Sequence, residues 1–299
     1  MTGLWNLVRR NCKLFFKDKG MFFSALITPI ILLVLYATFL AKIYRDSFQG
    51  ALAEAGATVS DALISATVGG QLISSLLAVA CVTVAFCSNL LMVQDKVSGA
   101  RRDITVSPAK SSTLAIGYFC ASALSTLIVT FTAMGVCLLY LATMGWYMSA
   151  ADVFAVILDV FLLTLFGVAL SSCINCLLKT QGQGSAVGTI VSAGYGFLCG
   201  AYMPISNFTP SLQKVLSFLP GTYGTSLLRN HALAGVYREM NAIGFPEEVV
   251  ESIRDSVDCN IYFFGHSVPT GGMYAILAGS TALLIGVYVL ICTLRRNKL

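Results

Sequence analysis

Six long apolar segments alternate with shorter polar ones along this chain of 299 residues. A helix needs roughly 20 mainly apolar residues to cross about 30 Å of hydrocarbon. The segments that meet this length lie at approximately 22–41, 67–93, 113–141, 153–177, 186–203 and 273–294. The pattern therefore predicts an all-α polytopic membrane protein with six transmembrane helices, folded as a single transmembrane domain over residues 1–299.

The first 20 residues show a different pattern, that of an amphipathic helix. Apolar side chains recur on one face, and basic side chains recur four residues apart on the opposite face. A helix of this kind lies in the membrane interface, with its cations toward anionic headgroups. We expect these residues to anchor it to the membrane surface: Trp5, Arg9, Arg10, Lys13 and Lys17.

The longest polar region, residues 204–270, combines two patterns. Its first part, up to about residue 235, has apolar positions at helical spacing bounded by Pro210 and Pro220, which predicts short re-entrant helices before the last span. The segment 239–258 is acidic. It is consistent with a solvated cap or with a site that binds a cationic substrate, and the sequence leaves both readings open.

Composition and charge set the environment and the orientation. Hydrophobic residues make up 57% of the chain and charged residues 11%, too few to cover a soluble core of this size. With the N-terminus in the cytoplasm, most of the 19 basic residues fall on the inner side, so both termini are predicted to be cytoplasmic. The first apolar run is too long for a cleaved signal peptide. We expect a multi-pass protein of the plasma (inner) membrane.

Motifs of enzyme chemistry are absent from the sequence. It contains no HExxH, no GxSxG and no GxxxxGK[ST] phosphate-binding loop, so we expect no catalytic site and no ATP hydrolysis by this chain alone. Cys173 and Cys176 form a CxxC within an apolar segment, where cysteine is usually a packing residue. No metal site and no nucleic-acid partner are predicted.

Polar side chains inside the apolar segments are the candidates for a substrate path. Asp159 is an acid within the fourth segment, and it is either a structural or path-facing partner or a proton carrier. On the second segment, polar side chains either line a path or form hydrogen bonds between helices. These residues are Gln71, Ser74, Ser75, Thr83, Ser88 and Asn89.

The polar segment at 94–112 lies between the second and third spans, on the cytoplasmic side. We expect a short helix parallel to the membrane, ended by Pro108. It would present Lys96, Arg101, Arg102 and Asp103 to the cytosol. Such an element fits a cleft in a cytoplasmic partner, or it is a simple positive-inside anchor.

Two motifs carry a resemblance to a known family. The first is Asp95-Lys96-x-x-Gly99-Ala100, followed by Ile104, Val106 and Pro108. The second comprises Gly200, Pro204, Pro210, Pro220, Tyr223, Arg229 and Gly235. Together with the amphipathic N-terminal helix and six spans, they resemble the type-2 permeases of the ATP-binding-cassette (ABC) superfamily. Asp95 and Ala100 stand where that family usually has Glu and Thr.

The resemblance implies a half-transporter. Two permeases, identical or homologous, would pair, and two separate nucleotide-binding subunits would bind ATP and Mg; no cofactor is expected in this chain. Residues 1–20 would be the elbow helix, and 94–112 would couple to the ATPase. The residues expected to make this coupling are Asp95, Lys96, Gly99, Arg101, Arg102, Asp103 and Pro108.

The expected function is export of an amphipathic or hydrophobic compound, such as a drug, a peptide or a lipid-linked molecule. The path would follow the dimer interface, formed by spans one, two and five. Polysaccharide or glycolipid export by the same machinery is one alternative. A proton-coupled secondary transporter that uses Asp159 is another, although the sequence shows none of the inverted repeats typical of that class.

Overall fold

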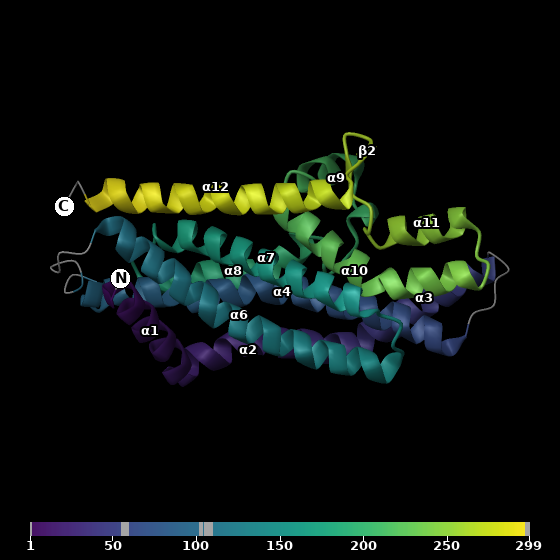
Figure 1. Cartoon of the computed structure of the whole chain (residues 1–299), viewed down its shortest axis with the longest axis horizontal. Helices are drawn as coiled ribbons and strands as arrows, with labels where there is room; N and C mark the ends of the chain where they lie inside the picture. The colour runs from purple at the N-terminus through teal and green to yellow at the C-terminus, as the bar shows by residue number, and fades with distance from the viewer. Residues whose placement is uncertain (1, 55–59, 102–103, 105–109, 297–299) are drawn as a thin grey trace.

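The computed structural model describes residues 2–54, 60–101, 104 and 110–296. They form an elongated bundle of helices (Figure 1), with one hairpin of two short strands, β1 (Tyr262–Phe263) and β2 (His266–Ser267). The helices of the bundle are α1 (Thr2–Lys17), α2 (Lys19–Leu35), α3 (Ala41–Glu54), α4 (Asp61–Val97), α6 (Ser111–Met144), α7 (Ala150–Asn175), α8 (Gln181–Leu198) and α12 (Thr270–Arg296). The all-α prediction thus describes the fold except for this hairpin.

Among the described residues, five helical segments are long and apolar enough to cross a membrane. They are Lys19–Gly50, Asp61–Val97, Ser111–Met144, Ala150–Asn175 and Thr270–Leu294. The fifth predicted span, 186–203, corresponds to α8, which has only 18 residues and begins with two glutamines separated by glycine. The chain is therefore a multi-pass membrane protein with five such helices, and a sixth span at α8 stays a prediction.

The first of these segments extends beyond the predicted span. A π-helical turn, η1 (Tyr36–Leu40), joins α2 to α3, and the helix continues to Glu54. Most of the connection predicted at 42–66 is therefore helical. The next helix, α4, begins at Asp61, where the Ser60 hydroxyl accepts a hydrogen bond from the Leu63 amide and an acid occupies the first turn, both favourable at a helix N-terminus.

Helix α4 is the centre of the bundle. Most of its 37 residues are buried, and α2, α6, α7, α8 and α10 (Pro220–Ala242) pack around it. Gly167 lets α7 approach closely, because a Cβ at this position would lie 2.8 Å from the carbonyl oxygen of Cys81 on α4. By contrast, the apolar part of Lys19–Gly50 is only 25% buried within the chain. One side of the bundle is therefore covered and another is open.

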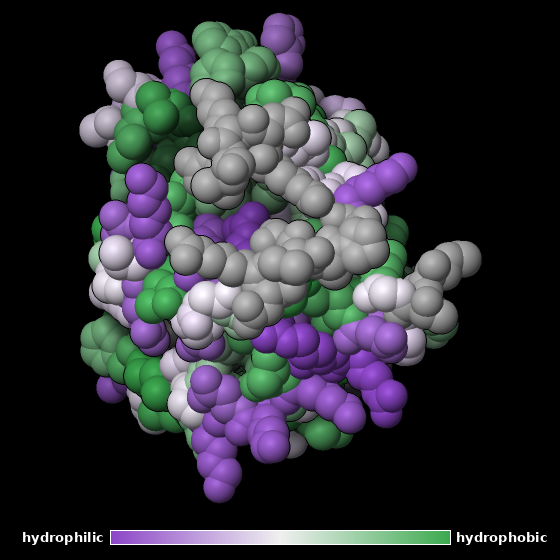
Figure 2. Space-filling view, turned by 90° about the vertical axis from the view of Figure 1, so that its left-hand side faces the viewer, coloured by the Kyte–Doolittle hydropathy of each residue, from purple (hydrophilic) through white to green (hydrophobic). Residues whose placement is uncertain are grey.

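The two ends of the bundle differ. Figure 1 shows the N- and C-termini at one end, together with the end of α4 and the start of α6; we call this the terminal end. Viewed directly, it presents many hydrophilic residues (Figure 2), and Lys110 and Lys179 are exposed there. The opposite, distal end holds α3 and α11 (Glu247–Ser256). The start of α1 and the end of α12 thus lie at one end of the bundle, and the cytoplasmic location of this end stays a prediction.

Residues 204–270 pack partly into the distal half. A 3-10 turn, η2 (Ile205–Asn207), and the short α9 (Pro210–Leu216) lead into α10, and both α-helices begin with proline, which suits the first helical position. α10 is longer than the short helices predicted here, and most of its residues are buried against α4, α7 and α12. The acidic α11 follows it.

Candidate functional site

The end of α4 is joined to two other helices by one carboxylate. Asp95 lies in the last turn of α4 and is 4% exposed. Arg10 of α1 donates two hydrogen bonds to it, from Nη1 to Oδ2 at 2.7 Å and from Nη2 to Oδ1 at 3.1 Å. The Tyr118 hydroxyl of α6 donates a third at 2.6 Å. Three helices thus share one bidentate, charge-assisted site.

The next residue, Lys96, connects α4 to α7. Its Nζ donates to the carbonyl oxygens of Asn175, Cys176 and Leu178 at 2.8–3.0 Å. These carbonyls end α7, where a cation also complements the negative end of the helix dipole. The ammonium group is therefore engaged within the chain, rather than presented to the cytosol as the sequence predicts. We call Arg10, Asp95, Lys96 and Tyr118 together the elbow junction.

Electrostatics favours the ionised form of this junction. The hydrogen bonds from Arg10 to Asp95 raise the pKa of Arg10 above its ordinary value, although partial burial opposes the shift. The Arg10 side chain is 36% exposed and the Asp95 side chain only 6%. The pair is therefore fixed on the α4 side and still reached by solvent on the α1 side.

The chain leaves α4 at Gly99. This residue has φ of +83°, in the left-handed region that favours glycine and that commonly ends a helix. Ala100 and Arg101 are again helical, so the direction changes within one residue after the junction. The other predicted coupling residues, Arg102, Asp103 and Pro108, lie outside the described residues. The first residues of segment 94–112 thus belong to the last turn of α4, a helix of the core.

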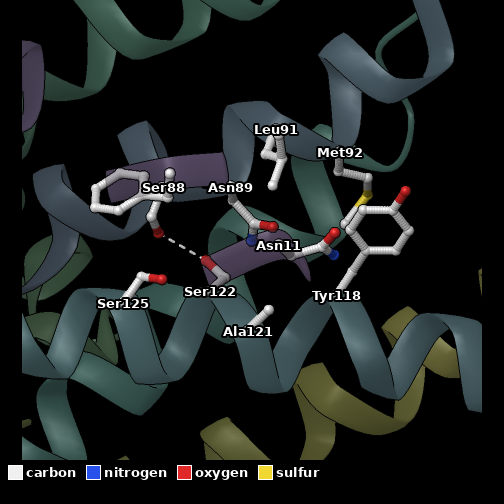
Figure 3. Close-up of a pocket in the computed structure, with 10 residues that line it drawn as sticks. Asn11, Ser88, Asn89, Leu91, Met92, Tyr118, Ala121, Ser122 and Ser125 are labelled. Carbon is white, nitrogen blue, oxygen red and sulfur yellow. Dashed lines mark hydrogen bonds between the residues drawn. The ribbon is translucent and has the colours of Figure 1, made fainter. Parts of the chain in front are cut away.

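A polar pocket lies beside the junction, between α1, α4 and α6 (Figure 3). Ser88 shares hydrogen bonds with Ser122 at 2.7 Å and Thr126 at 2.8 Å, and Asn11 of α1 points into the same space. The pocket has a volume of about 10 Å³, roughly the space for one water molecule. It is a site of contact between helices and is too small for a substrate.

Three charged clusters hold α10 in the distal half. The first contains Asp159, 1% exposed, whose Oδ2 lies 2.6 Å from Nδ1 of His231 and whose Oδ1 accepts from the Tyr274 hydroxyl at 2.5 Å. We call these three residues the Asp159 cluster. The second is the ion pair between Asp152 and Arg238. Both clusters link α7 to α10, and Tyr274 connects the Asp159 cluster to α12 as well.

The third cluster surrounds Arg229, whose side chain is completely buried. It donates to the carboxylate of Asp258, the carbonyls of Val257 and Gly200, and the hydroxyl of Ser75 on α4. Asp258 also accepts from the amides of Ile205 and Ser206. Burial raises the pKa of the Asp258 carboxyl, while Arg229 and the two amides oppose this shift. We call Arg229, Asp258 and Ser75 the Arg229 clamp.

Comparison with known families now identifies the chain. Residues 2–232 match the model of the family described as ABC-2 type transporter, which is more than half of the chain. The protein belongs to the ABC-2 type transporter family. It is the permease subunit, the transmembrane part of an ABC transporter, whose ATPase activity lies in separate subunits with which ABC-2 permeases generally pair. A search of curated proteins found no match to this chain.

The predicted path residues of this ABC-2 permease are all inside the protomer. None of the six on α4 is more than 5% exposed. Asn89 donates to the hydroxyls of Ser171 and Ser172 on α7, and Ser75 belongs to the Arg229 clamp. Ser75, Ser88 and Asn89 thus bond to other helices, whereas Ser74 and Thr83 donate to backbone carbonyls of α4 itself, and a substrate path along these residues stays a prediction. Those six residues are Gln71, Ser74, Ser75, Thr83, Ser88 and Asn89.

The predicted membrane anchors divide into two groups. Trp5, Arg9, Lys13 and Lys17 are exposed on α1, as an interfacial helix requires. Arg10 instead turns toward the bundle to bind Asp95. In the described part of the chain, no group of three or more His, Cys, Asp or Glu side chains is arranged to hold a metal ion.

Sequence reasoning missed the partners of the two acids on α7, although a signal was present. Asp152 and Asp159 are seven residues apart on α7, and His231 and Arg238 are seven residues apart on α10. When two helices run antiparallel, equal spacings bring both acids opposite both bases. Here Asp159 meets His231 and Asp152 meets Arg238. Tyr118 and Tyr274 gave no comparable signal, because a single tyrosine in an apolar helix predicts no particular partner.

Proposed function

We propose that this ABC-2 permease is half of the membrane part of an ATP-driven exporter in the plasma membrane. It would span the membrane six times, with α8 as the short fifth span, and pair with a second permease, a copy or a homologue. Two nucleotide-binding subunits would supply ATP and Mg. The transported compound would be amphipathic or hydrophobic: a drug, a peptide or a lipid-linked molecule.

The elbow junction is the observation that carries this proposal. Segment 94–112 starts directly from a helix end that is bonded to α1, α6 and α7 through Asp95 and Lys96. A displacement of this segment by an ATPase would therefore act on four helices together. Arg101, Arg102, Asp103 and Pro108 would contact the ATPase, while Asp95, Lys96 and Gly99 would fix the segment to the bundle.

The substrate path would follow the open faces of α2 and α8. Both helices pack on α4 yet remain largely exposed, and large apolar side chains such as Phe23, Ile30 and Ile190 are more than half exposed. Ser185 and Thr189 add exposed polar groups on α8. A second permease against these faces would enclose a mildly polar, mainly apolar path, and α4 with its six polar residues would support it from behind.

Charge reversal of Arg101 and Arg102 to Glu tests the coupling. We expect the variant to keep its thermal stability and to lose substrate-stimulated ATP hydrolysis. The two glutamates would be repelled by the surface of the ATPase, which in the proposal binds cations. Reversal of Lys19 and Lys179 is the matched control, since both are exposed cations outside the segment. A variant with normal stimulated hydrolysis and an intact complex would contradict the coupling role.

A tagged pull-down from the native membrane in mild detergent tests the assembly. A cytoplasmic P-loop ATPase in stoichiometric amount is the expected result. Its absence, from membranes that keep other such complexes intact, would remove the proposal of an ATP-driven exporter.

The Asp159 cluster supports a second candidate, a proton-coupled transporter. A buried carboxylate bonded to an imidazole and a phenol is a group able to bind and release a proton. The substitution Asp159→Asn separates the two mechanisms in vesicles. Transport that continues with ATP and without pH dependence favours the exporter, and transport lost together with its pH dependence favours proton coupling.

A further inference from the structure

An open groove lies between α1 and α6, along one side of α1. Its volume is about 620 Å³, within the range of small-molecule sites, roughly 300–1,000 Å³. The opposite side of α1 packs on the bundle through Asn11 and Phe15, both nearly fully buried. The lining residues are Trp5, Val8, Arg9, Cys12, Lys13, Phe16, Lys17 and Leu124.

One edge of the groove is strongly cationic. Arg9, Lys13 and Lys17 recur every four residues along α1, so they form one row, and all three are exposed. The sequence of α1 contains no acidic residue, and no ion pair of the described chain involves any of the three. Arg10, in contrast, is neutralised by Asp95. The row is thus an uncompensated site for an anion.

The rest of the groove is apolar and continues along a membrane-crossing helix. Leu124 and Ile128 lie one turn apart on α6 and are 41% and 46% exposed. α6 carries no charged residue from Ser111 to Met144. Trp5 and Phe16, also exposed, add aromatic rings of the kind that sits at headgroup depth. An occupant must therefore have an anionic head and a hydrocarbon tail.

We propose that this groove binds one anionic phospholipid as a defined site. The phosphate of the headgroup would contact Arg9, Lys13 and Lys17, and an acyl chain would lie on Leu124 and Ile128. Position and charge both favour a lipid, because the groove opens beside a helix that spans the membrane and its charges match a phosphate. The bound lipid would hold α1, and through Arg10 the elbow junction, at a fixed depth. The site does not depend on what the permease transports.

Quenching of Trp5 fluorescence by brominated lipids measures occupancy directly. The chain has two tryptophans, so Trp146→Phe leaves Trp5 as the only tryptophan of this chain, and the signal of Trp5→Phe/Trp146→Phe is subtracted to remove the tryptophans of the other subunits. The full-length protein, with the subunits that co-purify, is placed in vesicles of phosphatidylcholine with increasing brominated phosphatidylglycerol or brominated phosphatidylcholine. We expect saturable quenching at a low fraction of the anionic lipid and weak, linear quenching by the neutral one.

The double variant Arg9→Gln/Lys13→Gln in the same background locates the site. Each cation near an anionic surface contributes about a fivefold factor in affinity, so the apparent affinity for phosphatidylglycerol falls roughly 30-fold. The control Lys110→Gln/Lys179→Gln removes two exposed charges from the same end and keeps the wild-type curve. Soluble glycerol phosphate does not compete, because it lacks the chains.

Three results would overturn the proposal. Equal quenching by the two brominated lipids would show that the groove does not select anionic lipid. An equal loss in the control variant would assign the preference to the general surface charge. Absence of quenching by either lipid in the assembled complex would show that a second permease or an ATPase covers the groove instead.

Discussion

The elbow junction and the Arg229 clamp both tie several helices together through one ion pair, yet their surroundings differ. Arg229 has a completely buried side chain and four acceptors, among them two backbone carbonyls. Arg10 is 36% exposed and contacts Asp95 from a helix at the edge of the bundle. The Arg229–Asp258 pair is enclosed within the fold, whereas the Arg10–Asp95 pair lies between α1 and α4, where solvent reaches Arg10.

This difference separates a fixed region from one that is able to rearrange. Removing one partner of a buried ion pair costs about 3–5 kcal/mol, because the remaining charge is left without compensation. An exposed pair contributes about 0–1 kcal/mol, because water replaces the lost partner. The distal half is therefore expected to act as a rigid block around α10, while α1 is able to shift against α4 at a modest cost.

The largest effect is expected at the clamp. Arg229→Met leaves the Asp258 carboxylate buried against two amides with no cation, and we expect a loss of about 3–5 kcal/mol in the free energy of unfolding. Thermal unfolding in detergent measures it. Arg254→Met is the control, since that side chain is 35% exposed and its acid partner, Glu251, is 52% exposed; we expect a much smaller change in the free energy of unfolding.

A second variant shows whether the uncompensated charge causes the loss. In Arg229→Met/Asp258→Asn the charge is removed, and asparagine tolerates the positive φ of +54° at this position. We expect the double variant to be more stable than Arg229→Met alone. If the double variant is less stable, packing rather than charge dominates the clamp, and the contrast with the elbow junction fails.

A smaller effect on stability is expected at the elbow junction. Asp95→Asn removes charge-assisted hydrogen bonds from the partly exposed Arg10 side chain, and we expect a cost of about 1 kcal/mol. Among the described residues, Arg10→Gln leaves the buried Asp95 carboxylate with the Tyr118 hydroxyl alone, and we expect a larger cost of about 1–3 kcal/mol. A double-mutant cycle measures the interaction energy between Arg10 and Asp95. The exposed pair Arg45–Asp61, at 3.0 Å, is the matched reference with a coupling near zero. A loss above about 3 kcal/mol would make the junction as rigid as the clamp.

Much of this architecture was predictable because the membrane restricts the choices. Runs of apolar residues located the long helices, and the basic row on α1 predicted an exposed interfacial helix. Segment 186–203 was predicted as a span, but α8 begins earlier, at Gln181, and its glutamines and glycines lower the hydropathy of the helix without preventing it from forming. Length and composition are good predictors of which segments form helices in a membrane. They say little about which face of each helix is covered by the rest of the protein.

The partners within the bundle could not be predicted in the same way. Asp95 and Lys96 were identified as a pair of coupling residues, but their contacts with Arg10 and the end of α7 depend on helix rotations that periodicity does not fix. The polar face of α4 illustrates the same limit. Small polar side chains line a path or bond to a neighbouring helix with equal ease, and only the packing of α6 and α7 against α4 distinguishes the two.

The smallest effect is expected at His231, and it appears only as a dependence on pH. Burial opposes the charged imidazole, but the hydrogen bond and charge of Asp159 outweigh it and raise the pKa of His231 above the ordinary 6.5; Asp152 adds to the increase. Tyr274 and Arg238 are the other titratable groups around it. A group with a raised pKa stabilises the folded protein below its unfolded pKa, and this contribution is lost as pH rises through the folded value.

Melting curves at a series of pH values test this sign. The wild-type protein should lose stability as pH rises from below 6.5 through the raised pKa, and His231→Gln should lack this part of the slope. The exposed His266, replaced by glutamine, serves as the control because it lies in the β-hairpin and forms no ion pair within the described part of the chain. An unchanged slope in His231→Gln would mean that the imidazole stays neutral beside Asp159. The Asp159 cluster would then resemble the Arg229 clamp, a fixed contact with no response to pH.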